Sequence, residues 1–192
     1  MLSWIILIVA AVVVIYAIVV FNRLVRMRQM ANEAWSGIDV QLKRRSDLIP
    51  NLVDTVKGYA AHERGVLDEV TQLRSAARAV PSGDVAARAQ VEGALSLALG
   101  RLFALAENYP DLKASGNFLD LQQQLSGLES DLQMARRYYN GTVRNLNTLV
   151  QSVPSNLVAR MFGFGERAYF EISDEAERAV PRVSLVPAQP AS

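Results

Sequence analysis

The first 22 residues of the chain carry no charge and are almost entirely hydrophobic. The apolar run from Leu2 to Phe21 is 20 residues long, and a helix of that length rises about 30 Å, the thickness of the hydrocarbon core of a bilayer. Trp4 and Tyr16 lie toward its ends, where aromatic rings favour the headgroup region. We therefore expect a transmembrane helix over residues 1–22 that spans the lipid bilayer once.

The residues that follow this run are basic. Arg23, Arg26 and Arg28 precede the first acidic residue, Glu33, and positive residues next to a span favour the cytoplasmic side. We therefore expect a single-pass protein of the cell membrane, with its amino terminus outside and its body in the cytoplasm. A cleaved signal peptide is the alternative, but no basic residue precedes the run and the run is longer than the apolar region of most signals.

Beyond the span, apolar residues recur at alternating steps of three and four, which is typical of helices that pack along a narrow seam, as in coiled coils. One such register runs without a slip from Ala31 to Val80, and only Arg45 and Glu63 break its apolar pattern. Two further registers run from Val91 to Tyr109 and from Phe118 to Val153. The pattern predicts an all-α fold, in which a single amino-terminal transmembrane helix continues into an antiparallel helical bundle.

Breaker residues separate the three registers. Residues 81–84 and 109–117 are rich in Pro, Gly, Ser and Asp, and short loops of this kind make successive helices antiparallel neighbours. Pro50 is the open point, because a proline removes a backbone hydrogen bond and clashes with the preceding turn. The unbroken register favours three long helices, the first kinked at Pro50. A break at Pro50 would instead give four helices of similar length, an up-and-down four-helix bundle.

The end of the chain differs from the bundle. The last long helix is expected to stop near Pro154, and a short apolar helix follows at 157–164. Its few apolar side chains favour a cap on the end of the bundle, and contact with a bilayer or another protein is the alternative. We predict three parts: the transmembrane helix at 1–22, the helical bundle at 23–165, and an acidic, then Pro/Ala/Ser-rich tail at 166–192 that is partly disordered.

Composition excludes several kinds of site. The chain has no cysteine and one histidine, so a thiolate zinc site, an iron–sulfur cluster and a cysteine nucleophile are all excluded. His62 has no ligand partner at the spacing of a helical metal motif, and we expect no catalytic residue, no metal and no cofactor. The 20 Lys+Arg nearly balance the 19 Asp+Glu, with the basic excess beside the span, which argues against a nucleic-acid partner.

Arg45 and Glu63 are charged residues at seam positions. A charge that is buried without a partner costs several kcal/mol, so each needs an opposite charge from a neighbouring helix if the seam is buried there. The candidate partners are Glu129 or Asp131 for Arg45, and Arg88 or Arg101 for Glu63. Such structural ion pairs would fix the register of the helices. A solvated face is the alternative.

The kinked form also predicts an exposed apolar seam close to the span. If the first helix is continuous, we expect no other helix of the chain beside Ala31, Trp35, Ile38 and Leu42. An uncovered apolar stripe drives self-association. The expected partner of this seam is therefore a second copy of the chain or another membrane protein.

Four stretches of the chain carry a recognisable pattern. They are EAWSGIDVQLKRRSDLIPNLVDTVKGYAAHE (33–63), LFALAENYPDLKASGNFLDLQQQL (102–125), YYN (138–140) and PSNLVARMFGF (154–164). In this order and spacing they resemble the LemA family of bacterial membrane-anchored helical proteins. The resemblance implies one amino-terminal membrane helix followed by an all-helical bundle. It implies no activity, because the family has no agreed biochemical function.

These observations favour a membrane-anchored scaffold or protein-interaction module at the cytoplasmic face, without catalytic activity of its own. The alternative is a regulatory or sensing subunit of a larger membrane protein complex. An enzyme is the third class, and the shortage of acid–base groups argues against it.

Overall fold

The computed structural model describes residues 1–60 and 62–171. These residues form six helices: α1 (Leu2–Tyr59), α2 (Arg64–Ala79), α3 (Val85–Ala106), α4 (Pro110–Lys113), α5 (Gly116–Gln151) and α6 (Ser155–Met161). The described part of the chain contains no strand. The predicted all-α fold is confirmed, with an apolar amino-terminal helix that continues into a helical bundle. Most of the tail expected at 166–192 lies outside the described residues.

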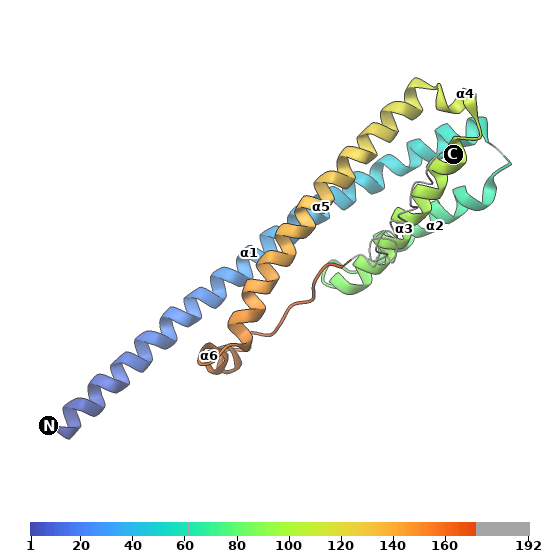
Figure 1. The fold of residues 1–192 in the computed structure, drawn as a ribbon. Helices are drawn as coiled ribbons and strands as arrows, with labels where there is room; N and C mark the ends of the chain where they lie inside the picture. The colour runs from blue at the N-terminus through green and yellow to red at the C-terminus, as the bar shows by residue number, and fades with distance from the viewer. Residues whose placement is uncertain (61, 172–192) are drawn as a thin grey trace, which may run out of the picture.

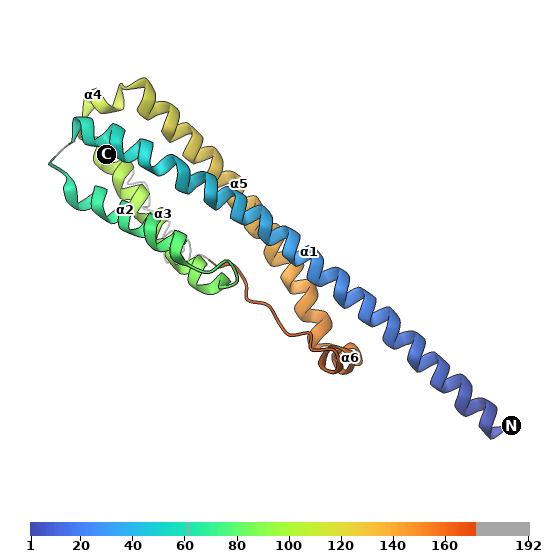
Figure 2. The same cartoon turned by 180° about the vertical axis from the view of Figure 1, so that it is seen from behind.

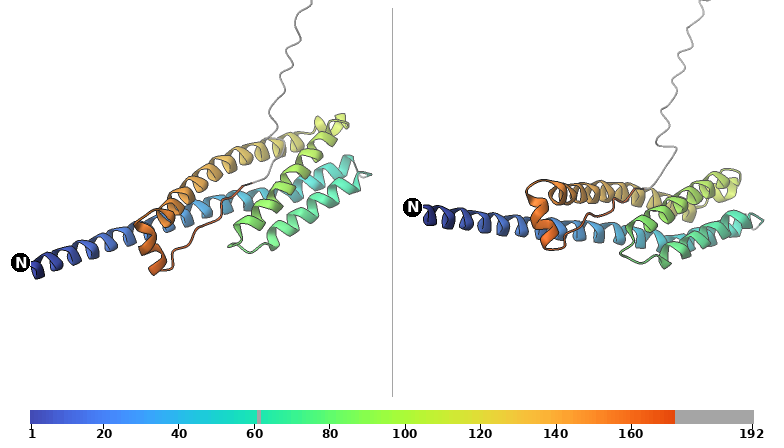
Figure 3. Two further views of the ribbon diagram at one scale, coloured as in Figure 1. Left: turned by 60° about the horizontal axis from the view of Figure 1, so that its bottom comes forward. Right: turned by 90° about the horizontal axis from the view of Figure 1, so that it is seen from below.

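Helix α1 runs the full length of the molecule (Figure 1). Helix α5 lies antiparallel beside it, and α2 and α3 form an antiparallel hairpin beside the carboxyl-terminal part of α1 (Figure 2). The first turns of α1 project beyond the other helices (Figure 3). Residues 2–16 are accordingly exposed, whereas Val20 and Leu24 are buried against α5 and α6. We call the end of the bundle near α6 proximal and the end near α4 distal.

The chain turns back after Tyr59. Helix α1 continues through Pro50, as the three-helix form expects, but α2 starts at Arg64 as a separate helix. The prediction of one continuous helix from residue 31 to residue 80 is therefore wrong. The alternative prediction of a break at Pro50 is also wrong. The bundle has four long helices. The break falls between Gly58 and Gly65, where glycine lowers the helix propensity, and it leaves Ala60 in a non-helical conformation (φ −127°, ψ 50°) but buried in the core.

The passage of α1 through Pro50 has a local explanation. Proline has no N–H to donate to the carbonyl four residues earlier, which is that of Ser46. Arg74 of α2 donates from Nε to this Ser46 oxygen at 2.7 Å. The neighbouring helix therefore replaces the hydrogen bond that Pro50 removes, and the freed carbonyl does not break α1.

The distal core joins all four long helices. It buries Leu52 of α1, Val70 of α2, Leu102 of α3 and Leu121 of α5 in one cluster. Each side chain comes from a position of the three-and-four register, so the periodicity of the sequence locates this core directly.

The proximal half has a different third layer. Here α1 and α5 pack against each other and against an extended segment, residues 165–171, which runs back from α6 along the bundle (Figure 1). Phe170 in this segment is fully buried against Ile38 and Tyr139. The packed structure therefore continues beyond the boundary expected at residue 165.

Two asparagines of α5 hold the extended segment. Asn140 Nδ2 donates to the Phe170 carbonyl at 3.2 Å, and Asn140 Oδ1 accepts from the Phe170 N–H at 2.9 Å. Asn147 makes the same pair of bonds with Arg167, at 3.0 and 2.9 Å. The two residues are seven positions apart, so they lie on one face of the helix. Their amides satisfy backbone groups that have no partner in a helix or a sheet.

Candidate functional site

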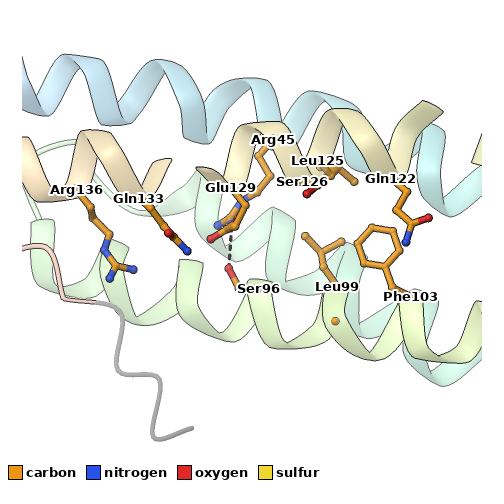
Figure 4. Close-up of a pocket in the computed structure, with 11 residues that line it drawn as sticks. Arg45, Ser96, Leu99, Phe103, Gln122, Leu125, Ser126, Glu129, Gln133 and Arg136 are labelled. Atoms are coloured by element: carbon orange, nitrogen blue, oxygen red, sulfur yellow. Dashed lines mark hydrogen bonds and ion pairs between the residues drawn. The ribbon is translucent and has the colours of Figure 1, made fainter. Parts of the chain in front are cut away.

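Arg45 is the largest fully buried side chain among the described residues, with 2% of its surface exposed. It projects from α1 between α3 and α5 (Figure 4). Its Nη1 donates to Ser96 Oγ at 2.8 Å and to Glu129 Oε2 at 3.0 Å. Its Nη2 donates to the carboxylate of Glu92 and, at 3.3 Å, to the Glu92 carbonyl. One guanidinium therefore joins three helices.

Glu92 extends this cluster toward a second arginine. Its Oε1 accepts from Arg88 Nε at 3.1 Å, one turn earlier on α3. Arg88 also donates to Asp39 of α1 at 3.4 Å and to the Ala77 carbonyl at the end of α2 at 3.0 Å. The cluster of Arg45, Arg88, Glu92, Glu129 and Asp39 thus alternates charges, and this lets both Arg45 and Glu92 be buried.

The sequence predicted one of the two acidic partners of Arg45 correctly. Glu129 is among the candidates and lies in contact, whereas Asp131 is not part of the cluster. Glu92 was missed because it lies outside the apolar register of its helix. Its spacing of four from Arg88 is the one signal in the sequence that marks it, since i, i+4 pairs of opposite charge bond along a helix.

Glu63 has a different partner from those expected. It precedes α2 and accepts a hydrogen bond from the hydroxyl of Tyr109 at 3.1 Å. Arg88 bonds Glu92 and Asp39, and Arg101 bonds Glu69, so the proposed pairs of Glu63 with these arginines are wrong. The end of α1 at Tyr59 moves Glu63 out of the seam and into a turn. Partial burial and the bond to the Glu63 carboxylate raise the pKa of Tyr109.

A groove between α3 and α5 opens over the Arg45 cluster (Figure 4). Its volume is about 460 Å³. Its apolar part is formed by Leu99, Phe103 and Leu125, and its polar rim carries Gln122, Gln133 and Arg136. We call it the α3–α5 groove.

The polar groups of this groove are largely engaged with one another. The carboxylates of Glu92 and Glu129 are engaged by Arg45, and a general base must be available to a substrate proton. Among residues 1–60 and 62–171, no group of three or more His, Cys, Asp or Glu side chains could hold a metal ion. The groove lining combines an aromatic ring, aliphatic side chains, amides and an arginine, a mixture common at protein interfaces.

The seam at Ala31, Trp35, Ile38 and Leu42 is covered within the chain. Ala31, Ile38 and Leu42 are buried in the proximal half of the bundle with α5 and Phe170. The expectation that this seam has no partner in the chain is wrong, because α5 runs back along α1 for 36 residues. The structure thus removes the reason for expecting self-association through these residues.

Trp35 fixes the turn between α2 and α3 to α1. Its Nε1 donates to the Ser82 carbonyl at 3.0 Å. Its ring packs on Tyr139 and Phe170, with ring centroids 5.4 and 5.5 Å away. Burial raises the pKa of the Tyr139 hydroxyl, which donates to the Ala168 carbonyl at 3.0 Å.

The residues expected at the membrane interface lie on the exposed part of α1. Trp4 and Tyr16 are 71% and 40% exposed, and Arg23 and Arg26 are also exposed. Arg28 stacks over the ring of Phe164, with its guanidinium carbon 4.9 Å from the centroid. The basic residues therefore surround α1 where it leaves the bundle.

Two helices in the described residues are long and apolar enough to cross a membrane, α1 and α3. Helix α3 is packed in the bundle, where its Glu92 holds Arg45, so it is a core helix. The apolar window of α1 is only 6% buried within the protein.

The fold and the site together define a helical bundle that is stabilised by a buried ion-pair cluster and extended by an apolar amino-terminal helix. The LemA family model matches residues 34–185. The chain belongs to the LemA family.

One of the named relatives carries the name of this family. Protein LemA of Metamycoplasma hominis is 28% identical over 153 residues, which cover 80% of this chain and 69% of that protein. Magnetosome protein MamQ of Magnetospirillum gryphiswaldense is 23% identical over 174 residues, 78% of this chain and 64% of the relative. A second magnetosome protein, MamQ 1 of Paramagnetospirillum magneticum, is also 23% identical, and the match covers 64% of its length. The chain thus spans slightly less than two thirds of the MamQ proteins. The apolar helix and these relatives suggest membrane anchoring.

Proposed function

We propose that this protein is a membrane-anchored scaffold whose bundle binds a protein partner at the cytoplasmic face and catalyses no reaction. The anchor is the first part of α1, where residues 2–16 are exposed and apolar. The orientation follows from Arg23, Arg26 and Arg28, which directly follow the span and favour the cytoplasmic side.

The observation that carries the interaction role is the α3–α5 groove above the Arg45 cluster. The cluster joins α1, α3 and α5 through one buried guanidinium, so the two walls of the groove are held at a defined spacing. A surface that is already organised loses less entropy when a partner binds. Phe103 and Arg136 are residue types that often dominate the energy of protein interfaces.

Site-specific photo-crosslinking tests the groove. A benzophenone amino acid replaces Gln133, which lines the α3–α5 groove, or Gln124, which lies on another face of α5 beside Arg44 and Leu48. In native membranes, the probe at residue 133 is expected to form a defined adduct with a protein, and the matched probe at residue 124 is not. The substitution Arg136→Glu is expected to weaken the adduct.

The protein found in the adduct distinguishes a scaffold from the alternative, a regulatory or sensing subunit of a larger complex. An adduct with several proteins or with a second copy supports a scaffold. A single stoichiometric membrane protein supports a regulatory or sensing subunit instead. Equal crosslinking at residues 133 and 124 contradicts the groove as the binding surface. A nucleotide or metal that copurifies in stoichiometric amount would favour an enzyme over both.

Cysteine accessibility tests the orientation. The chain has no cysteine, so Ser3→Cys and Ser75→Cys each introduce one thiol at an exposed position. In intact cells a membrane-impermeant maleimide is expected to label residue 3 alone, and lysis is expected to expose residue 75. The reverse pattern would place the bundle outside.

A further inference from the structure

Helix α6 lies beside the part of α1 that enters the apolar span. The ring of Phe162, directly after α6, packs on Phe21 of α1 with centroids 4.8 Å apart. Phe162 also lines an apolar groove with Val14, Ala17 and Ile18. These three residues belong to the run from Leu2 to Phe21 that is long enough to cross a bilayer. The end of α6 is therefore at the depth of the span.

The two faces of α6 have different surroundings. Val158 and Ala159 are buried against Val20 and Leu24 of α1 and against Leu146 of α5. This inner face caps the bundle, the role favoured by the sequence.

The outer face of α6 is apolar and has no cover within the described chain. Leu157 is 63% exposed and Met161 77% exposed, and their spacing of four places them on one side of the helix. Val153 before α6 and Phe162 after it are also exposed, at 79% and 52%. Contiguous apolar surface of this kind marks a contact with a protein or a membrane.

The charges around this surface match a bilayer with anionic lipids. Residues 1–32 and 140–165, which lie toward the proximal end, contain no Asp or Glu. Their five arginines are Arg23, Arg26, Arg28, Arg144 and Arg160. Arg160 lies on α6 itself and is exposed, and long basic side chains can reach lipid phosphates while neighbouring apolar groups enter the acyl boundary.

We propose that α6 is an interfacial helix whose outer face, Leu157 and Met161, lies with the flanking Val153 and Phe162 in the headgroup–acyl boundary of the bilayer that α1 crosses. The occupant is lipid because this face is continuous with the span through Phe162 and Ile18. Helix α6 thus gives the bundle a second contact with the membrane and fixes its tilt and height at the surface. This inference rests on the membrane anchoring in the proposed function.

The test uses the full-length chain with single cysteines in phosphatidylcholine–phosphatidylglycerol vesicles. Leu157→Cys and Met161→Cys report on α6, and Met134→Cys, an exposed methionine on α5, is the matched control. Ile8→Cys, within the apolar run, reports on the anchor. Each thiol carries an environment-sensitive fluorophore, and the vesicles contain little protein relative to lipid. The fluorescence is quenched in one measurement by nitroxide-bearing lipids and in another by aqueous iodide.

The labels at residues 157 and 161 are expected to be quenched by nitroxide lipids several-fold more strongly than the label at residue 134, and several-fold less by iodide. If they respond like residue 134 while residue 8 is quenched by lipid, the interfacial role is overturned and the anchoring stands. If residue 8 is not quenched by lipid, the anchoring itself is overturned. Protection from iodide without lipid quenching would show that a second copy covers α6, and it also overturns the proposal.

Discussion

The distal and proximal halves of the bundle bury the same pair of helices in different ways. In the distal half, α1 and α5 pack with the α2–α3 hairpin, and charged groups around Arg45 connect the layers. In the proximal half the extended segment 165–171 packs on α1 and α5 beside the start of α3, and it is held by aromatic packing and by hydrogen bonds to backbone groups.

The two halves differ in how the free energy of folding is divided among their contacts. A buried ion pair concentrates a large free energy in a few atoms, because removing one partner leaves the other charge buried alone. Aromatic packing and backbone hydrogen bonds divide the free energy among many smaller contacts. We therefore expect the distal half to respond strongly to single substitutions at the cluster and the proximal half to respond locally.

The largest effect is expected from Arg45→Ala, which leaves Glu92 buried without its main partner. The expected loss is about 3–5 kcal/mol in the free energy of unfolding, measured by denaturant titration of the full chain in detergent. Arg45→Leu is expected to be similarly destabilising. The double variant Arg45→Leu with Glu92→Leu should recover most of the loss, because it removes both charges. A change of less than about 0.5 kcal/mol in either single variant would contradict a structural role for the cluster.

A smaller and more local effect is expected in the proximal half from Phe170→Ala. The ring fills a fully buried site against Trp35 and Tyr139, and its loss is expected to cost about 2 kcal/mol, because the segment can detach without unfolding the helices. Hydrogen exchange is expected to accelerate at residues 166–170 and to stay unchanged in α2 and α3. The neighbouring Tyr169→Ala, at a 37% exposed position, is the matched control. Acceleration throughout the bundle would show that the two halves unfold as one unit.

Periodicity and charge predict most of the fold and only part of the site. The register located the buried positions of α1, including Ile38, Leu42 and Arg45, because packing on one face of a helix imposes the spacing directly. It could not locate the turn after Tyr59, since residues 56–66 keep the spacing although the helix ends. The register also contains no information on Phe170 or on Glu92. Their burial depends on partners that are distant in the sequence, on α5 and on α1.

A third substitution tests the hydrogen bond that lets α1 pass through Pro50 in the distal half. Arg74→Ala is expected to cost about 1 kcal/mol, because it leaves the Ser46 carbonyl without a donor in a partly buried place. In a Pro50→Ala background the alanine N–H can take up this carbonyl, so Arg74→Ala should then cost clearly less. The double-mutant cycle is measured by denaturant unfolding. Equal costs in the two backgrounds would show that Arg74 acts through other contacts.

The smallest effect is expected from Tyr139→Phe, because it removes only one of the several hydrogen bonds that hold the extended segment. The hydroxyl donates to the Ala168 carbonyl at 3.0 Å, and its loss is expected to cost about 1 kcal/mol at neutral pH. Burial raises the pKa of Tyr139, so the neutral hydroxyl is favoured in the folded protein.

The contribution of this hydroxyl to the free energy of unfolding is fully present below the ordinary tyrosine pKa of about 10. It is lost as the pH rises through the higher pKa of the folded protein. The stability difference between the wild type and Tyr139→Phe should therefore shrink at alkaline pH, and Tyr138→Phe, at an exposed neighbouring position, serves as the control. A difference that stays constant across this range would mean that the Tyr139 hydroxyl is accessible to water in the folded protein.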